Sequence, residues 1–256
     1  MITTQQDGPV CLVVLDRPES RNALTGAMLS SLAETMAGLD SDPTVSVAIL
    51  TGRDPAFCAG LDLKDLARTY ESAVTTRSPR EAPWRGLLAP TSVPIIGAIN
   101  GAAVTGGLEL ALGCDFLIAS ERATFADTHA RVGVMPGGGL TIRLPQLVGV
   151  DRARRMSLTG IFVDAATALT WGLVTEVVPH DSLLDRAREL AAAISEVDPA
   201  ALGEIRSMYD AFADRHDNEA YRDEAAWSRR WMKDRFDEAA FSARREGIIE
   251  RGSAQQ

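Results

Sequence analysis

The sequence predicts an α/β fold, and three observations lead to this prediction. Short apolar runs suited to buried strands alternate with helical stretches through the first half of the chain. Glycine-containing loops follow two of these runs, as they do at strand-to-helix junctions. From Ser182 onward the pattern is helical almost throughout. The 256 residues are enough for one large domain, or for one domain with an appendage.

Four apolar runs are predicted to be strands. They are Val10 to Leu15, Val45 to Leu50 (which Thr51-Gly52 ends), Pro94 to Ile99, and Asp115 to Ser120. Between the first two, Met28 to Leu39 has helical spacing, with one apolar stripe made of Met28, Leu29, Leu32, Met36 and Leu39.

The remaining segments are turns, loops and C-terminal helices. Thr75 to Trp84 is polar, carries two prolines, and is predicted to be a surface loop or a broken helix. Gly133 to Gly139 holds four glycines and is predicted to be a turn. Ser182 with Asp185 resembles a helix capping box. The charged segment Tyr221 to Ile249 also carries four large apolar side chains that need a surface to cover, either the chain's own core or a neighbouring subunit: Trp227, Trp231, Phe236 and Phe241.

Composition excludes several classes of protein. The net charge of −9, without a Lys/Arg cluster, argues against a nucleic-acid partner. The sequence has no run of eighteen apolar residues, so we expect no membrane span. Its first residues have no signal-peptide pattern. The three cysteines match no zinc or disulfide spacing. We therefore expect the protein to lie in the reducing cytoplasm and to bind no metal.

Two loops are candidates for chemistry. Ala56 to Lys64 and Asn100 to Leu110 each follow a predicted strand and contain glycines. Such junctions are either plain tight turns or places where free backbone N–H groups stabilise negative charge. Neither carries the dinucleotide fingerprint, which argues against a nicotinamide-dependent oxidoreductase, and no Gly-x-Ser-x-Gly elbow suggests a serine hydrolase.

Glu109 and His129 are the candidate acid/base residues. Glu109 has apolar neighbours, so it either faces solvent or is partly buried with a raised pKa. His129 precedes the glycine turn and is either a surface residue or a group that titrates near neutral pH. Asp127, two residues earlier, is a plausible helix N-cap.

Five motifs in this order resemble the crotonase (enoyl-CoA hydratase/isomerase) family. They lie between about Val10 and Val178: Arg17-Pro-Glu-Ser-Arg-Asn-Ala-Leu24, Phe57-Cys-Ala-Gly-Leu-Asp-Leu63, Ala98-Ile-Asn-Gly-Ala-Ala-Val-Thr-Gly-Gly-Leu-Glu109, Cys114-Asp115, and Gly133-Val-Met-Pro-Gly-Gly-Gly139. The resemblance implies a spiral of ββα repeats over residues 1–195 and a helical C-terminal region, 196–256, that forms a homotrimer or a dimer of trimers.

The resemblance also implies an acyl-CoA thioester substrate and no cofactor beyond that coenzyme A. The backbone N–H groups of Leu61 and Gly106 would form the oxyanion hole. The CoA-binding positions would be Arg21, Ala23, Ala59, Gly60, Leu61, Asp62, Leu63 and Lys64, with Lys64 or Arg21 as a phosphate partner.

In hydratases of this family two glutamates bracket one water. Glu109 matches the first glutamate, and His129 occupies the position of the second. The expected function is enoyl-CoA hydration in fatty acid metabolism. The alternatives are another enolate reaction (isomerisation, decarboxylation or C–C bond hydrolysis) and an acyl-CoA-binding protein without catalysis.

Overall fold

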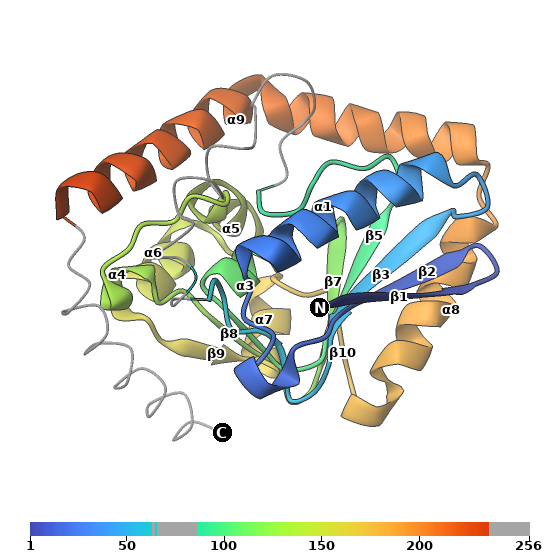
Figure 1. Ribbon diagram of the computed structural model, residues 1–256, viewed down its shortest axis with the longest axis horizontal. Coiled ribbons are helices and arrows are strands. Elements are labelled where there is room, and N and C mark those ends of the chain that lie inside the picture. Colours follow the sequence, from blue (N-terminus) through green and yellow to red (C-terminus); the bar gives the residue numbers. More distant parts are fainter. Residues whose placement is uncertain (63–64, 66–85, 236–256) are drawn as a thin grey trace.

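The fold is built on a six-stranded sheet with the order β1-β2-β3-β5-β7-β10 (Figure 1). The computed structural model describes residues 1–62, 65 and 86–235. The predicted loop Thr75 to Trp84, and Leu63, Lys64, Phe236 and Phe241, lie outside these residues. The strands of this sheet are β1 (Ile2–Asp7), β2 (Val10–Leu15), β3 (Val47–Gly52), β5 (Ile95–Ile99), β7 (Phe116–Ser120) and β10 (Glu176–Val178).

A second, smaller sheet gives the fold its repeating unit. Its strands have the order β4-β6-β8-β9 and are β4 (Ala56–Cys58), β6 (Ala102–Val104), β8 (Thr124–Ala126) and β9 (Phe162–Asp164). Strands β3, β5 and β7 are each followed by a short strand of this second sheet. Neighbouring strands are parallel in both sheets, except that β1 and β9 run antiparallel to their partners. This succession of long strand, short strand and helix is the expected ββα spiral.

Helices cover both sheets. They are α1 (Gly26–Ser41), α3 (Gly106–Leu112), α4 (His129–Val132), α5 (Leu140–Val148), α6 (Val150–Thr159), α7 (Ala165–Trp171), α8 (Leu183–Ser195) and α9 (Pro199–Arg235), with 3-10 turns at Pro18–Ser20 and His180–Ser182. The predicted stripe of α1 is buried at Met28, Leu32, Met36 and Leu39.

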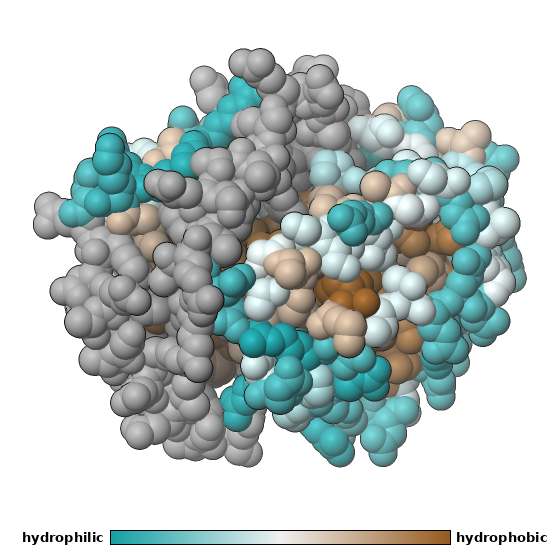
Figure 2. All heavy atoms as spheres, viewed as in Figure 1, coloured by the Kyte–Doolittle hydropathy of each residue, from teal (hydrophilic) through white to brown (hydrophobic). Residues whose placement is uncertain are grey.

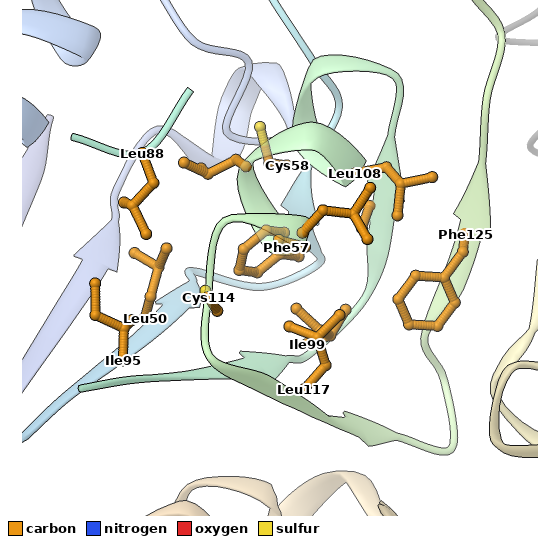
Figure 3. Packing of buried hydrophobic residues seen from close by; sticks show 14 of the residues in the cluster. Leu50, Phe57, Cys58, Leu88, Ile95, Ile99, Leu108, Cys114, Leu117 and Phe125 are labelled. Atoms are coloured by element: carbon orange, nitrogen blue, oxygen red, sulfur yellow. The ribbon is translucent and has the colours of Figure 1, made fainter. Parts of the chain in front are cut away.

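The large sheet is buried on both faces, which explains its continuous apolar strands. In β3, Val47 and Ile49 pack with α8 on one face, while Ala48 and Leu50 enter the main core on the other. Figure 3 shows part of this main core, in which Phe57 of β4 and Phe125 of β8 lie in one cluster with Leu108 of α3. This packing fixes the start of α3 between the two sheets.

Several sequence predictions need correction at their boundaries. Thr51 and Gly52 belong to β3 rather than ending it, because they continue its parallel pairing with β2. The three-residue strands of the second sheet were not predicted, since runs this short carry no periodicity. The capping box at Ser182 was wrong: the 3-10 turn runs directly into α8, so Ser182 has helical backbone angles and makes no side-chain cap.

Helix α9 lies along one edge of the molecule (Figure 1, orange to red) and packs against α5 and the glycine turn of the same chain. Its Ser228 hydroxyl donates to the Met135 carbonyl at 3.0 Å, and its Trp231 ring N–H donates to the Gly133 carbonyl at 3.0 Å. Trp227, by contrast, remains 67% exposed. Contact of this helix with a second subunit therefore stays a prediction.

Outside the grey atoms, the face in Figure 2 carries hydrophilic residues along its lower and right-hand edges, with small hydrophobic areas near the centre and toward the right. Among the described residues, no helix has both the length and the apolar character that a membrane crossing needs.

Candidate active site

Glu109 enters the site from α3, directly after a strained turn. Thr105 has φ 55° and ψ −114°, an uncommon backbone conformation for a residue with a side chain. Its hydroxyl contacts the Thr128 hydroxyl at 2.6 Å, and its N–H donates to Ala126 at 2.9 Å. A Cβ atom at Gly107 would stand 2.0 Å from the Cys58 carbonyl oxygen, so α3 starts against β4 only because this residue is glycine.

The carboxylate of Glu109 is buried, with 3% of the residue exposed, and it is held by the glycine turn. Its Oε1 accepts hydrogen bonds from the N–H groups of Gly137 and Gly138 at 3.2 and 2.7 Å. A Cβ atom at Gly138 would lie 2.8 Å from the carboxylate carbon. The sequence predicted the turn, but this role of its glycines was missed.

His129 lies beside Glu109 and is also buried. The Nε2 atom of His129 is 3.7 Å from Oε2 of Glu109, and the Nδ1 atom is 2.7 Å from Oδ1 of Asp127. The structure therefore decides against a solvent-facing position for either candidate. The prediction of Asp127 as the N-cap needs correction, because the residue at the N-cap of α4 is Thr128. Asp127 accepts a hydrogen bond from the His129 backbone N–H, and the same oxygen contacts the ring nitrogen Nδ1.

The shared environment shifts the pKa values of these three residues. Burial raises the pKa of Glu109 to about 7. Burial alone would lower the pKa of His129, but the negative charges of Glu109 and Asp127 outweigh it and raise that pKa. Burial likewise opposes ionisation of Asp127, but its hydrogen bond with His129 keeps the pKa of Asp127 below its ordinary value. Such a pair can exchange a proton near neutral pH.

Two backbone N–H groups lie near the start of the same helix. Leu24 pairs with both neighbours of Leu61, accepting from Asp62 and donating to Gly60, which leaves the Leu61 N–H outside the pairing. Among the described residues, no hydrogen bond uses the N–H of Leu61 or of Gly106. A Cβ atom at Gly106 would stand 3.3 Å from the Leu61 nitrogen, so glycine keeps this space open. Free N–H groups placed together can bind an oxyanion.

The two segments predicted to bind CoA lie side by side. The Ala59 N–H donates to the Arg21 carbonyl at 3.0 Å, and the Leu24 N–H donates to the Gly60 carbonyl at 2.8 Å. Arg21 is exposed and Ala23 is half-buried. The Asp62 carboxylate pairs with Arg17 at 2.6 Å.

Arg17 and Asn22 hold this region together, and no role was predicted for either residue from the sequence. Arg17 also donates to the Ala23 carbonyl at 3.0 Å. Asn22 is fully buried, and its amide donates to the carbonyls of Arg53 and Ala56, both at 2.7 Å. The asparagine inside this turn motif was the available signal, because asparagine side chains commonly bond the backbone of turns.

The sequence profile of the family described as Enoyl-CoA hydratase/isomerase matches residues 5–250. The chain belongs to this family. The protein named "Probable enoyl-CoA hydratase 1, peroxisomal" of Arabidopsis thaliana is 39% identical over 204 residues, which are 80% of this chain and 76% of that protein. A carnitinyl-CoA dehydratase of Citrobacter koseri is 35% identical over 218 residues, 84% of this chain and 82% of the relative.

A solved structure agrees with this assignment to the enoyl-CoA hydratase/isomerase family. The crystal structure of an enoyl-CoA hydratase from Mycobacterium avium is 47% identical and superposes with a TM-score of 0.81, covering 91% of this chain and 97% of that one. The expectation of a crotonase-like α/β fold is confirmed.

Proposed function

We propose that the protein is an enoyl-CoA hydratase that adds water across the α,β double bond of a trans-2-enoyl-CoA. One observation carries the proposal: Glu109 and His129 are both buried and 3.7 Å apart, and the helix of Glu109 begins beside two backbone N–H groups that bond to none of the described residues. Acid/base groups and an oxyanion hole are the parts that addition to a thioester requires.

In the proposed reaction, Glu109 takes a proton from the water that attacks Cβ. The electron pair of the double bond moves toward the thioester oxygen, where the N–H groups of Leu61 and Gly106 stabilise the enolate. His129 in its protonated form donates from Nε2 to Cα. Glu109 then holds one extra proton and His129 lacks one, so transfer between these neighbours restores the starting state.

The substrate would bind along the paired segments that contain Arg21 and Ala59. Their mutual hydrogen bonds support this part of the proposal, since they form one continuous backbone surface that leads to Leu61. The relationship to a carnitinyl-CoA dehydratase also supports the reverse direction, loss of water from a 3-hydroxyacyl-CoA, because both directions use the same groups.

The test is loss of the conjugated enoyl-thioester absorbance on a series of trans-2-enoyl-CoAs of increasing chain length. We expect loss with wild-type protein, and a rate at least ~10²-fold lower with Glu109→Gln, as when a general acid/base is removed. Glu34→Gln is the matched control, since Glu34 is an exposed carboxylate on α1. Tight acyl-CoA binding without any absorbance loss would refute hydration and favour another enolate reaction or a binding protein.

We also propose that α9 contributes to a homotrimer or a dimer of trimers. The support is its exposed large side chains, which a monomer would leave in water: Met208, Tyr209 and Trp227. Light scattering of the purified protein distinguishes a monomer, which would contradict this proposal, from a trimer or hexamer.

A further inference from the structure

Asp127 is fixed between the end of β8 and the start of α4. Only 1% of the residue is exposed. Its Oδ1 accepts the His129 backbone N–H at 3.1 Å and contacts the His129 Nδ1 atom at 2.7 Å. The residues on both sides of it are anchored as well, because Ala126 and Thr128 each bond to Thr105.

We propose that Asp127 is a positioning residue for His129: it accepts the Nδ1–H proton and thereby keeps Nε2, facing Glu109, as the atom that exchanges protons with the substrate. This inference rests on the proposed function of His129. An imidazole nitrogen that donates to a fixed carboxylate carries its proton in both charge states, so only the other nitrogen gains or loses one.

A capping role alone does not account for the geometry. A cap needs only the bond to the backbone N–H, whereas the same oxygen of Asp127 makes a shorter contact with the ring. Helix α4 has only four residues, so a cap there has little helix to stabilise. Asp127 also makes a side-chain hydrogen bond with Ser157 of α6, which an asparagine could accept as well. The contact with the ring nitrogen is therefore the feature that calls for a carboxylate at this position.

The surrounding charges favour the same arrangement. Three carboxylates act on His129 from different elements: Asp127 before α4, Glu109 on α3 and Glu224 on α9. Together they keep the pKa of His129 raised although burial opposes it. Of the three, Asp127 alone touches Nδ1, so it alone can select which nitrogen faces Glu109.

The test is Asp127→Asn, with three readouts. An asparagine amide can donate to Nδ1 and so stabilise the opposite tautomer. We expect kcat to fall by about 10²–10⁴-fold, as in triads that lose the orienting carboxylate, with KM for the enoyl-CoA nearly unchanged. The pH at which the rate falls on the alkaline side should move lower, because the imidazolium has lost a negative neighbour.

Nitrogen NMR of the ligand-free protein tests the tautomer without any activity. The chain has three histidines, so a His129→Gln spectrum assigns the signal of His129. We expect neutral wild-type His129 to carry its proton on Nδ1. A proton on Nε2 instead would overturn the inference, even if Asp127→Asn failed to fold.

Asp54→Asn is the matched control. It removes the carboxylate that contacts Nε2 of His180 at 3.2 Å, an Asp–His contact outside the proposed machinery. The asparagine keeps a side-chain oxygen for the hydrogen bond that Asp54 accepts from the Asn100 amide at 2.8 Å. We expect normal kcat, pH profile and His129 tautomer. If Asp127→Asn also left kcat, the pH profile and the His129 tautomer unchanged, Asp127 would be only a cap. If wild type did not hydrate enoyl-CoA, the proposed function would fail, and the tautomer would still decide the role of Asp127.

Discussion

The Nε2 atom of His129 lies 3.7 Å from the Oε2 atom of Glu109, and the two residues belong to successive repeats of the fold. Glu109 is on the helix that follows β6, and His129 begins the helix that follows β8. Since β6 and β8 are neighbours in the second sheet, their following helices emerge side by side. The proximity of the proposed acid/base residues is thus a consequence of the ββα repeat.

The pH dependence of the reaction should have two limbs. Glu109 must be ionised to accept a proton, and burial raises its pKa to about 7, so kcat/KM should rise as pH increases through about 7. His129 must be protonated, so the rate should fall again once pH exceeds its raised pKa. The steady-state rate from about pH 5 to about pH 10 measures both limbs. A flat profile would contradict these roles.

Stability should also depend on pH through this pair. The folded pKa values of Glu109 and His129 are both raised, so the folded protein binds protons more tightly than the unfolded chain. Their contribution is complete below the unfolded pKa of each group and is lost as pH rises through the folded pKa. The free energy of unfolding should therefore decrease from about pH 5 to about pH 8.

Glu109→Gln should make the free energy of unfolding less dependent on pH, because glutamine does not titrate. At about pH 8 we expect the variant to be more stable than wild type by on the order of 1–3 kcal/mol, because each unit of pKa shift corresponds to ~1.4 kcal/mol. The gain should shrink at about pH 5. Denaturant unfolding of both proteins at both pH values measures this gain. If the stability difference between variant and wild type were the same at the two pH values, the proposed link between the Glu109 pKa and stability would be disproved.

Gly138→Ala should impair turnover although it replaces neither residue of the proposed acid/base pair. The added Cβ atom would stand 2.8 Å from the Glu109 carboxylate, so the carboxylate has to shift. We expect kcat to fall by ~10²-fold, the scale for a misplacement of about 1 Å. Gly38→Ala on α1 is the control, since nothing lies within 4 Å of its Cβ position. Equal rates for the two variants would argue against the positioning of Glu109 by Gly138.

His129→Ala should separate catalysis from binding. The imidazole contacts Asp127 and lies beside Glu109, but no described contact joins it to the paired segments at Arg21 and Ala59. We expect turnover to drop by at least ~10²-fold while the affinity for coenzyme A stays within about twofold. Calorimetric titration with coenzyme A checks the affinity. Full activity in this variant would remove His129 from the mechanism.

Glu224 should couple α9 to the glycine turn. Its carboxylate accepts from the N–H groups of Gly139 and Thr141 at 2.6 and 2.8 Å, and also from the Thr141 hydroxyl. We expect Glu224→Ala to lower the free energy of unfolding by about 2 kcal/mol, the scale for losing charge-assisted hydrogen bonds. Activity should fall too, because Gly138 binds Glu109 one residue earlier. A variant with unchanged melting temperature and rate would refute this coupling.

The sequence alone determined the local features of this protein. The long strands β2, β3, β5 and β7, the helix over Met28 to Leu39 and the glycine turn were predictable, because apolar periodicity and glycine act within a few residues. The family and the candidates Glu109 and His129 followed from motifs that keep their order along the chain.

Only the tertiary structure decided what surrounds those residues. The sequence left open whether Glu109 and His129 face solvent, and it assigned Asp127 to a helix cap. Their burial, and the bond from Gly138 to Glu109, depend on segments that are distant in the sequence and pack together in the fold. The contact of Asp127 with the His129 ring joins residues only two positions apart, but the side-chain conformations that make it were set by the fold. A pKa follows from desolvation and from nearby charges, and both are set by distances in space that spacing along the chain does not encode.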